Sequence, residues 1–225
     1  RSFFPATQNR RGDGPASRGV VLDMAAGLKY AWSSISIRLL LIVAVALGIL
    51  LRPIVELMPA YVGRVLEGDA AALAWLLASA GSGAMLASLW LAWRGATQGL
   101  TRIMLWNFAA TVIALIAFLY SGDLAIGVAL LFVYGYCSAT VLISNQILIQ
   151  TTVEDYLRAR IMSIYALTVR AIPAFGAFMA GQLADRLGIV PTFLGGAIAG
   201  LVFWIWIRRN AGRNNIAQRI EAPRT

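Results

Sequence analysis

Three charged residues of this sequence stand inside long apolar stretches, where an isolated charge is costly. Arg52 and Glu56 are four residues apart, so on a helix they share one face, and Pro53 lies between them. Arg170 lies in a later stretch. A carboxylate in such a place can carry a proton, and a guanidinium can pair with it or hold an anion. Arg52 and Glu56 therefore have two interpretations: a structural ion pair, or a site for substrate or protons.

Charge balance makes these three residues the candidates for transport or coupling. Glu56 is the acid that lies well inside an apolar run, which favours it as a protonatable coupling group. Arg170 has no acid near it in its own run, so Arg52, Glu56 and Arg170 together leave a positive charge uncompensated. We expect the compensating charge to come either from an acid outside this chain or from an anionic substrate.

A second polar group surrounds the connection between the fourth and fifth apolar runs. Asn145 and Gln150 lie near the end of the fourth run, and Asp155, Arg158 and Arg160 follow in the connection. Amide, acid and guanidinium groups at one membrane face can form a gate, and this is our hypothesis for them. The alternative is ordinary capping of helix ends at the interface.

Composition excludes several classes of function. The 225 residues are 60% hydrophobic and 13% charged, with no histidine and the single cysteine Cys137. Histidine metal sites, histidine acid–base catalysis and intrachain disulfides are therefore ruled out. The net charge of +9 is spread between apolar runs instead of along one stripe, which argues against nucleic acid as a partner. We find no phosphate-binding loop, so we expect neither ATP hydrolysis nor another cofactor.

The elements that would position these residues are six helices crossing a lipid bilayer. Six apolar runs have the length that a span of about 30 Å requires, since each residue of a helix adds about 1.5 Å. They cover residues 39–62, 71–93, 101–120, 124–150, 160–183 and 190–207. We predict an all-α membrane fold in which residues 1–31 form a linker ending in a short interfacial helix, 32–209 a six-helix bundle and 210–225 a basic tail.

Prolines and small residues predict the shape and packing of these helices. Pro53 predicts a kink in the first helix, and Pro173 an interruption or bend in the fifth. Small residues allow two helices to approach closely in lipid. They are concentrated in the second, fifth and sixth runs, for example at Gly83, Gly176 and Gly196.

The basic residues predict the orientation. Of the 19 arginines and lysines, 15 lie on one side and two, Arg64 and Arg186, on the other; the remaining two are Arg52 and Arg170. Because cytoplasmic loops carry the excess of positive charge, we expect both ends of the chain in the cytoplasm.

Four stretches together resemble the C-terminal six helices of the major facilitator superfamily. They are Leu-Arg-Pro at 51–53 with Glu-Leu-Met-Pro at 56–59, Ala-Gly-Ser-Gly-Ala at 80–84, Tyr-Leu-Arg-Ala-Arg-Ile-Met-Ser-Ile-Tyr at 156–165, and Gly-Gln-Leu-Ala-Asp-Arg-Leu-Gly at 181–188. Within the superfamily, the chain is similar to the bacterial branch of siderophore exporters and macrolide-efflux-like proteins. The resemblance covers about residues 20–209.

The resemblance implies half of a twelve-helix fold, with an N-terminal six-helix half as the missing partner. Substrate would then bind between the halves near the middle of the bilayer, with alternating access. The branch implies proton-coupled efflux of a small molecule across the inner (plasma) membrane. Two alternatives remain from the residues alone: a membrane scaffold without transport activity, and a membrane-embedded enzyme, against which the lack of histidine speaks.

Overall fold

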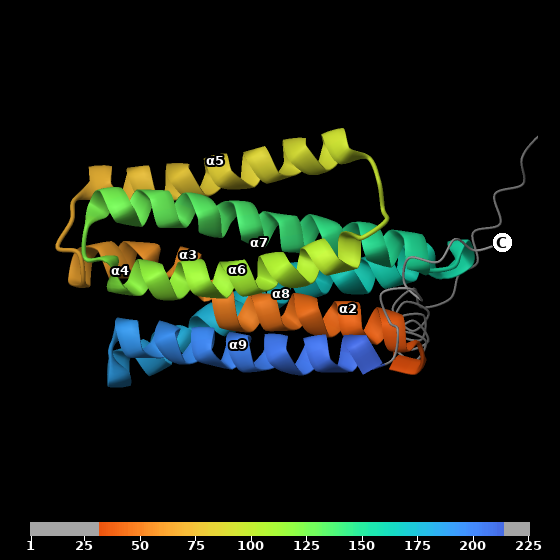
Figure 1. Ribbon diagram of the computed structural model, residues 1–225. Helices are drawn as coiled ribbons and strands as arrows, with labels where there is room; N and C mark the ends of the chain where they lie inside the picture. Colours follow the sequence, from red (N-terminus) through yellow and green to blue (C-terminus); the bar gives the residue numbers. More distant parts are fainter. Residues whose placement is uncertain (1–31, 214–225) are drawn as a thin grey trace, which may run out of the picture.

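Six helices of membrane-spanning length lie side by side in the part of the chain that the structure describes (Figure 1). The computed structural model describes residues 32–213, which contain no strand. In chain order the elements are α2 (Ile35–Ala46), the π-helix η1 (Leu47–Leu51), α3 (Pro53–Glu56), α4 (Met58–Arg64), α5 (Ala70–Arg94), α6 (Leu100–Ser121), α7 (Leu124–Thr152), α8 (Asp155–Leu187) and α9 (Ile189–Arg213). The elements α2, η1, α3 and α4 follow one another as one interrupted first helix.

The structure confirms the predicted all-α membrane fold and its six spans. Two helix ends differ from the prediction. Helix α8 already begins at Asp155, within the predicted connection, and α9 runs to Arg213, into the predicted basic tail. The interfacial helix predicted within residues 1–31, and the tail beyond 213, lie outside the described residues.

The helices begin and end at residues suited to those positions. The Asp69 carboxylate accepts a hydrogen bond from the Ala72 N–H at 2.9 Å and so caps the start of α5, and Asp123 caps α7 in the same way. Gly95 and Gly122, with φ of +60° and +58°, follow the ends of α5 and α6 in the left-handed conformation that glycine adopts without strain. The connections are therefore short, and neighbouring spans run antiparallel.

Helix α7 lies at the centre of the packing, between α5 and α6 in Figure 1, and also contacts α2 and α8. Two glycines allow the close approach of α5 and α7. A methyl group on Gly83 would collide with the backbone of Phe132, and one on Gly135 with the backbone of Ala80. Close backbone approach is how helices gain van der Waals contact in a solvent as apolar as they are.

Pro173 does not interrupt the fifth span, and this part of the prediction is wrong. Helix α8 is continuous from Asp155 to Leu187 with the proline inside it. A proline in a membrane helix is tolerated when neighbouring groups accommodate the freed carbonyl and the ring. Here the ring lies beside Gly48, where an added Cβ would be 3.4 Å from the Pro173 Cδ atom.

Candidate functional site

The first helix changes its hydrogen-bonding pattern immediately around Arg52. The Arg52 N–H donates to the Leu47 carbonyl at 3.0 Å, five residues back, as in a π-helix. Pro53 has no N–H to donate, and the Val55 N–H turns to the Arg52 carbonyl at 3.0 Å, three residues back. At the predicted kink the helix therefore passes from a wider π-helical turn to a tighter turn with a three-residue hydrogen bond. Arg52 lies where the two turns meet.

This irregular segment is held by a tyrosine from α7. The Tyr134 hydroxyl donates to the Leu51 carbonyl at 2.8 Å, and the tyrosine is buried. The Leu51 carbonyl is the group that Val55 would serve in a regular helix. Tyr134 therefore satisfies a carbonyl that the irregularity would otherwise leave buried without a donor.

Glycines of α8 and α9 bring these helices against the same backbone segment. A Cβ on Gly176 would lie 3.0 Å from the Gly48 carbonyl oxygen and 3.0 Å from the Ile49 Cα. A Cβ on Gly196 would lie 2.8 Å from the Leu50 carbonyl oxygen. The π-helical turn, which directly precedes Arg52, is thus packed against α8 and α9 through one glycine of each helix.

The structure places Arg52 and Glu56 where the first helix crosses α8, and Arg170 farther along α8. Arg52 directly precedes Pro53, whose Cγ atom would lie 3.1 Å from a Cβ on Gly176. Arg170 lies six residues before Gly176, about 9 Å along the helix axis. Glu56 ends α3, one turn beyond Arg52.

These three side chains differ in exposure and do not pair. Arg52 is half-buried, whereas Glu56 and Arg170 are exposed on the surface of the bundle. Arg52 and Glu56 form no ion pair with each other, so the structural ion pair considered from the sequence is absent. Arg170 likewise has no ionic partner among the described residues. A carboxylate and two guanidinium groups are therefore available for a proton, an anion or another part of the protein.

The predicted gate residues separate into two groups. Asn145 is fully buried, and its Nδ2 donates to the Leu40 carbonyl of α2 at 2.9 Å, while its Oδ1 has no partner among the described residues. It therefore ties α7 to the first helix inside the bundle. Gln150 is half-buried near the end of α7, and Arg158 and Arg160 are exposed on the first turns of α8. Asp155 begins α8, and its side chain lies outside the described residues.

Sequence reasoning missed Tyr134 and Gly135. Both lie in a uniformly apolar run, where neither the tyrosine nor the glycine has a neighbour that marks it. One signal was present for Tyr134: a hydroxyl far inside a membrane span needs a hydrogen-bond partner. The identity of that partner, a carbonyl freed by an irregular turn, follows only from the three-dimensional structure.

Comparison with known proteins identifies the family whose sequences this chain matches. Residues 11–217 match the family described as transmembrane secretion effector. The chain is 28% identical over 185 residues to the multidrug efflux pump Tap of Mycolicibacterium fortuitum, a match that covers 79% of this chain and 43% of that protein. The chain thus spans less than half the length of that curated relative. No solved structure matches the chain.

Proposed function

Because the chain belongs to the transmembrane secretion effector family, within the major facilitator superfamily, we propose that it is the C-terminal half of a proton-coupled exporter of a small molecule. The relative with the printed name of a multidrug efflux pump supports efflux as the direction. Its greater length supports a second, N-terminal half as partner, with a substrate cavity between the halves and alternating access. A transporter of this kind is not an enzyme.

The observation that carries the proposal is the exposed carboxylate of Glu56 at the irregular part of the first helix. It has no ionic partner among the described residues, and it lies one turn from Arg52. Carboxylates without an ionic partner in membrane spans are the groups that proton relays of transporters use. Opening the cavity alternately to the two sides would then move protons against substrate.

The positive charges of Arg52 and Arg170 call for a negative group that the described residues do not supply. Arg52 lies where the first helix crosses α8, and Arg170 lies about 9 Å from that crossing along α8. A positive charge inside a membrane span attracts an anion or a carboxylate. We propose that an acid of the N-terminal half, or an anionic group of the substrate, occupies the space between them. Arg158 and Arg160, with Gln150, would form part of a gate at the cytoplasmic face, which the positive-inside rule assigns to the end that holds residues 32 and 213.

The test is substrate transport by the full-length protein in vesicles, with Glu56→Gln compared with the natural protein at equal abundance. We expect the variant to lose transport driven by a proton gradient and to keep downhill exchange of substrate, since only the proton carrier is removed. Glu67→Gln is the matched control, because Glu67 is an exposed acid in the loop before α5, outside the spans. Glu67→Gln should transport normally.

Two outcomes would contradict parts of the proposal. Unchanged gradient-driven transport in Glu56→Gln would assign the coupling proton to another residue. Loss of both gradient-driven transport and downhill exchange, in a variant that folds and reaches the membrane, would make Glu56 part of the substrate site rather than the proton carrier.

A further inference from the structure

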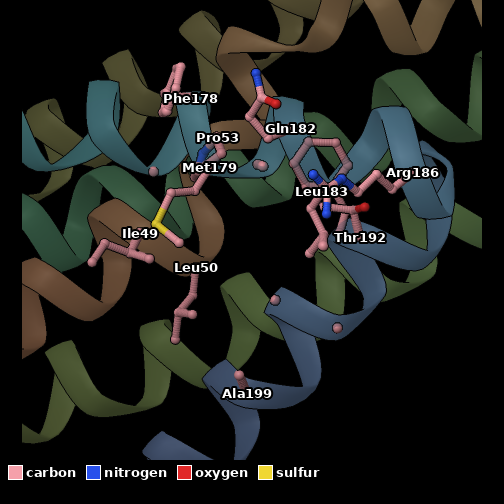
Figure 2. A pocket seen from close by; sticks show the side chains of 15 residues that line it. Ile49, Leu50, Pro53, Phe178, Met179, Gln182, Leu183, Arg186, Thr192 and Ala199 are labelled. Atoms are coloured by element: carbon pink, nitrogen blue, oxygen red, sulfur yellow. The ribbon is translucent and has the colours of Figure 1, made fainter.

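A large apolar groove lies between α8, α9 and the irregular part of the first helix (Figure 2). Its volume is about 790 Å³, within the range of about 300–1,000 Å³ typical of ligand sites. In Figure 2, Ile49 and Leu50 lie at one side, and Leu183, Arg186 and Thr192 at the other, with Met179 between them. The polar side chains of the lining are those of Gln182, Arg186 and Thr192.

The groove borders the helix crossing at Pro53 and Gly176, but the side chains of the coupling candidates do not line it. Arg52, Glu56 and Arg170 are not among the lining residues. On α8, Arg170 and the groove residue Met179 are nine positions apart, so at about 100° per residue they point to opposite sides of the helix. A ligand beside Met179 would therefore lie on the side of α8 opposite to Arg170.

The rim of the groove is apolar and exposed, as expected of a surface that faces lipid tails. Phe178, Met179 and Leu183 of α8 line the groove and are 66%, 53% and 44% exposed. All three lie within a membrane-spanning segment. Hydrocarbon is the solvent around membrane-spanning segments, so an open apolar groove there suits a hydrocarbon chain of the bilayer.

One end of the groove carries an uncompensated positive charge. Arg186 lies in the last turn of α8, where the span ends, and it has no ionic partner among the described residues. Its neighbour Asp185 is engaged elsewhere, with its Oδ1 3.5 Å from the Arg64 Nη1. Thr192 stands beside it, but the Thr192 hydroxyl already donates to the Gly188 carbonyl, so Arg186 supplies the charge at this end of the groove.

We propose that this groove binds one anionic phospholipid, with an acyl chain along Met179 and Leu183 and the phosphate at Arg186. The apolar floor, the membrane position and the single cation at the span end each match one part of such a molecule. From Thr192 to Ala199 the groove follows α9 for seven residues, or about 10 Å, which is deep enough to hold much of one acyl chain. The ligand is a phospholipid of the membrane leaflet on the side of Arg186.

The first test fills the groove. The full-length protein, in nanodiscs that contain phosphatidylglycerol with a photoreactive acyl tail, is irradiated, and the labelled peptides are identified by mass spectrometry. We expect labels on residues 176–199. Gly195→Leu should remove them, because Gly195 lines the groove and an added Cβ there meets nothing within 4 Å, so the new side chain occupies the groove without a clash.

Gly181→Leu is the matched control for bulk. Gly181 lies on the same part of α8, does not line the groove, and also has nothing within 4 Å of an added Cβ. Labelling of residues 176–199 should persist in this variant. Equal labelling in Gly195→Leu and Gly181→Leu would overturn the proposal, since the lipid would then only surround the protein.

The second test addresses the headgroup. Labelling by photoreactive phosphatidylglycerol is compared with labelling by the zwitterionic phosphatidylcholine in the natural protein, in Arg186→Gln and in Arg209→Gln. We expect a preference for the anionic lipid that falls about fivefold in Arg186→Gln, as loss of one basic group at a membrane surface implies. Arg209, an exposed arginine at the other end of the bundle, should leave the preference unchanged. No preference, or one that survives Arg186→Gln, would overturn the assignment of the phosphate to Arg186.

Discussion

Tyr134 and Asn145 each extend from α7 to a backbone carbonyl of the first helix, at different depths. The Tyr134 hydroxyl contacts the Leu51 carbonyl, and the Asn145 amide contacts the Leu40 carbonyl. Lipid offers such groups no alternative partner, so a polar side chain inside a bundle tends to join two helices. The two bonds thus fix the first helix on both sides of its irregular turn.

Replacing Tyr134 by phenylalanine removes only the hydrogen bond to the Leu51 carbonyl. The ring and its packing remain, while the Leu51 carbonyl loses its donor. We expect Tyr134→Phe to lower the free energy of unfolding of the full-length protein by about 0.5–1.5 kcal/mol, the usual net value of one hydrogen bond. The measurement is unfolding by a denaturing detergent in mixed micelles.

Tyr136→Phe is the control for the loss of a hydroxyl on the same helix. Tyr136 is half-buried, its ring centroid is 6.4 Å from that of Trp90, and its hydroxyl makes no hydrogen bond within the described residues. Its replacement should change the stability little. If the two variants were equally stable, the bond to Leu51 would contribute nothing to holding the irregular turn.

The sequence predicts which residues carry charge at membrane depth, but not how they interact. A separation of four residues places Arg52 and Glu56 on one face, and this is compatible with an ion pair and with its absence. The structure resolves the point because Glu56 extends to the surface and Arg52 stays half-buried. Rotamers depend on neighbours from distant helices, which residue spacing does not describe.

At the scale of the element, single glycines determine how closely α5 and α7 approach. Gly83 and Gly81 are two residues apart on α5, yet a methyl group would collide with the Phe132 backbone at Gly83 and meet nothing within 4 Å at Gly81. We expect Gly83→Ala to cost about 1–3 kcal/mol or more, because the helices must separate. Gly81→Ala should be neutral or stabilising by up to about 1 kcal/mol, since alanine favours the helix.

For Gly83→Ala and Gly81→Ala, the measurements are the amount of folded protein in the membrane and the resistance of the protein to heat in detergent. Because both changes add the same methyl group, their difference reports only the contact of α5 with α7. Equal behaviour of the two variants would contradict the close crossing.

The elements were predictable to different degrees. Long apolar runs identify spans reliably because the bilayer thickness fixes the length that each needs, and all six were found. Pro53 indicated a kink but not a π-helical turn from Leu47 to Leu51, and the glycines of α8 and α9 that pack against this turn are distant from it in the sequence. Pro173 gave the same signal, and α8 nevertheless stays continuous.

At the scale of the whole molecule, the spans alternate in direction, so one experiment on two loops tests the orientation of the bundle. The loop before α5 contains Glu67, and the loop between α5 and α6 contains Gln98; they lie at opposite ends of α5. The second loop is ordered by Arg94, whose Nη2 donates to the Gln98 carbonyl at 2.6 Å, so the Gln98 side chain is not needed for its shape. Glu67 and Gln98 are both exposed.

We expect Glu67→Cys, and not Gln98→Cys, to react with a membrane-impermeant maleimide in intact cells, because the excess of positive charge places the Gln98 loop in the cytoplasm. The single natural cysteine, Cys137, is only 6% exposed within α7 and is first replaced by serine to remove background. Both variants should react after the cells are broken, which establishes that each thiol is accessible. The reverse pattern would place Arg64 and Arg186 in the cytoplasm, and it would assign the phospholipid at Arg186 to the inner leaflet instead of the outer one.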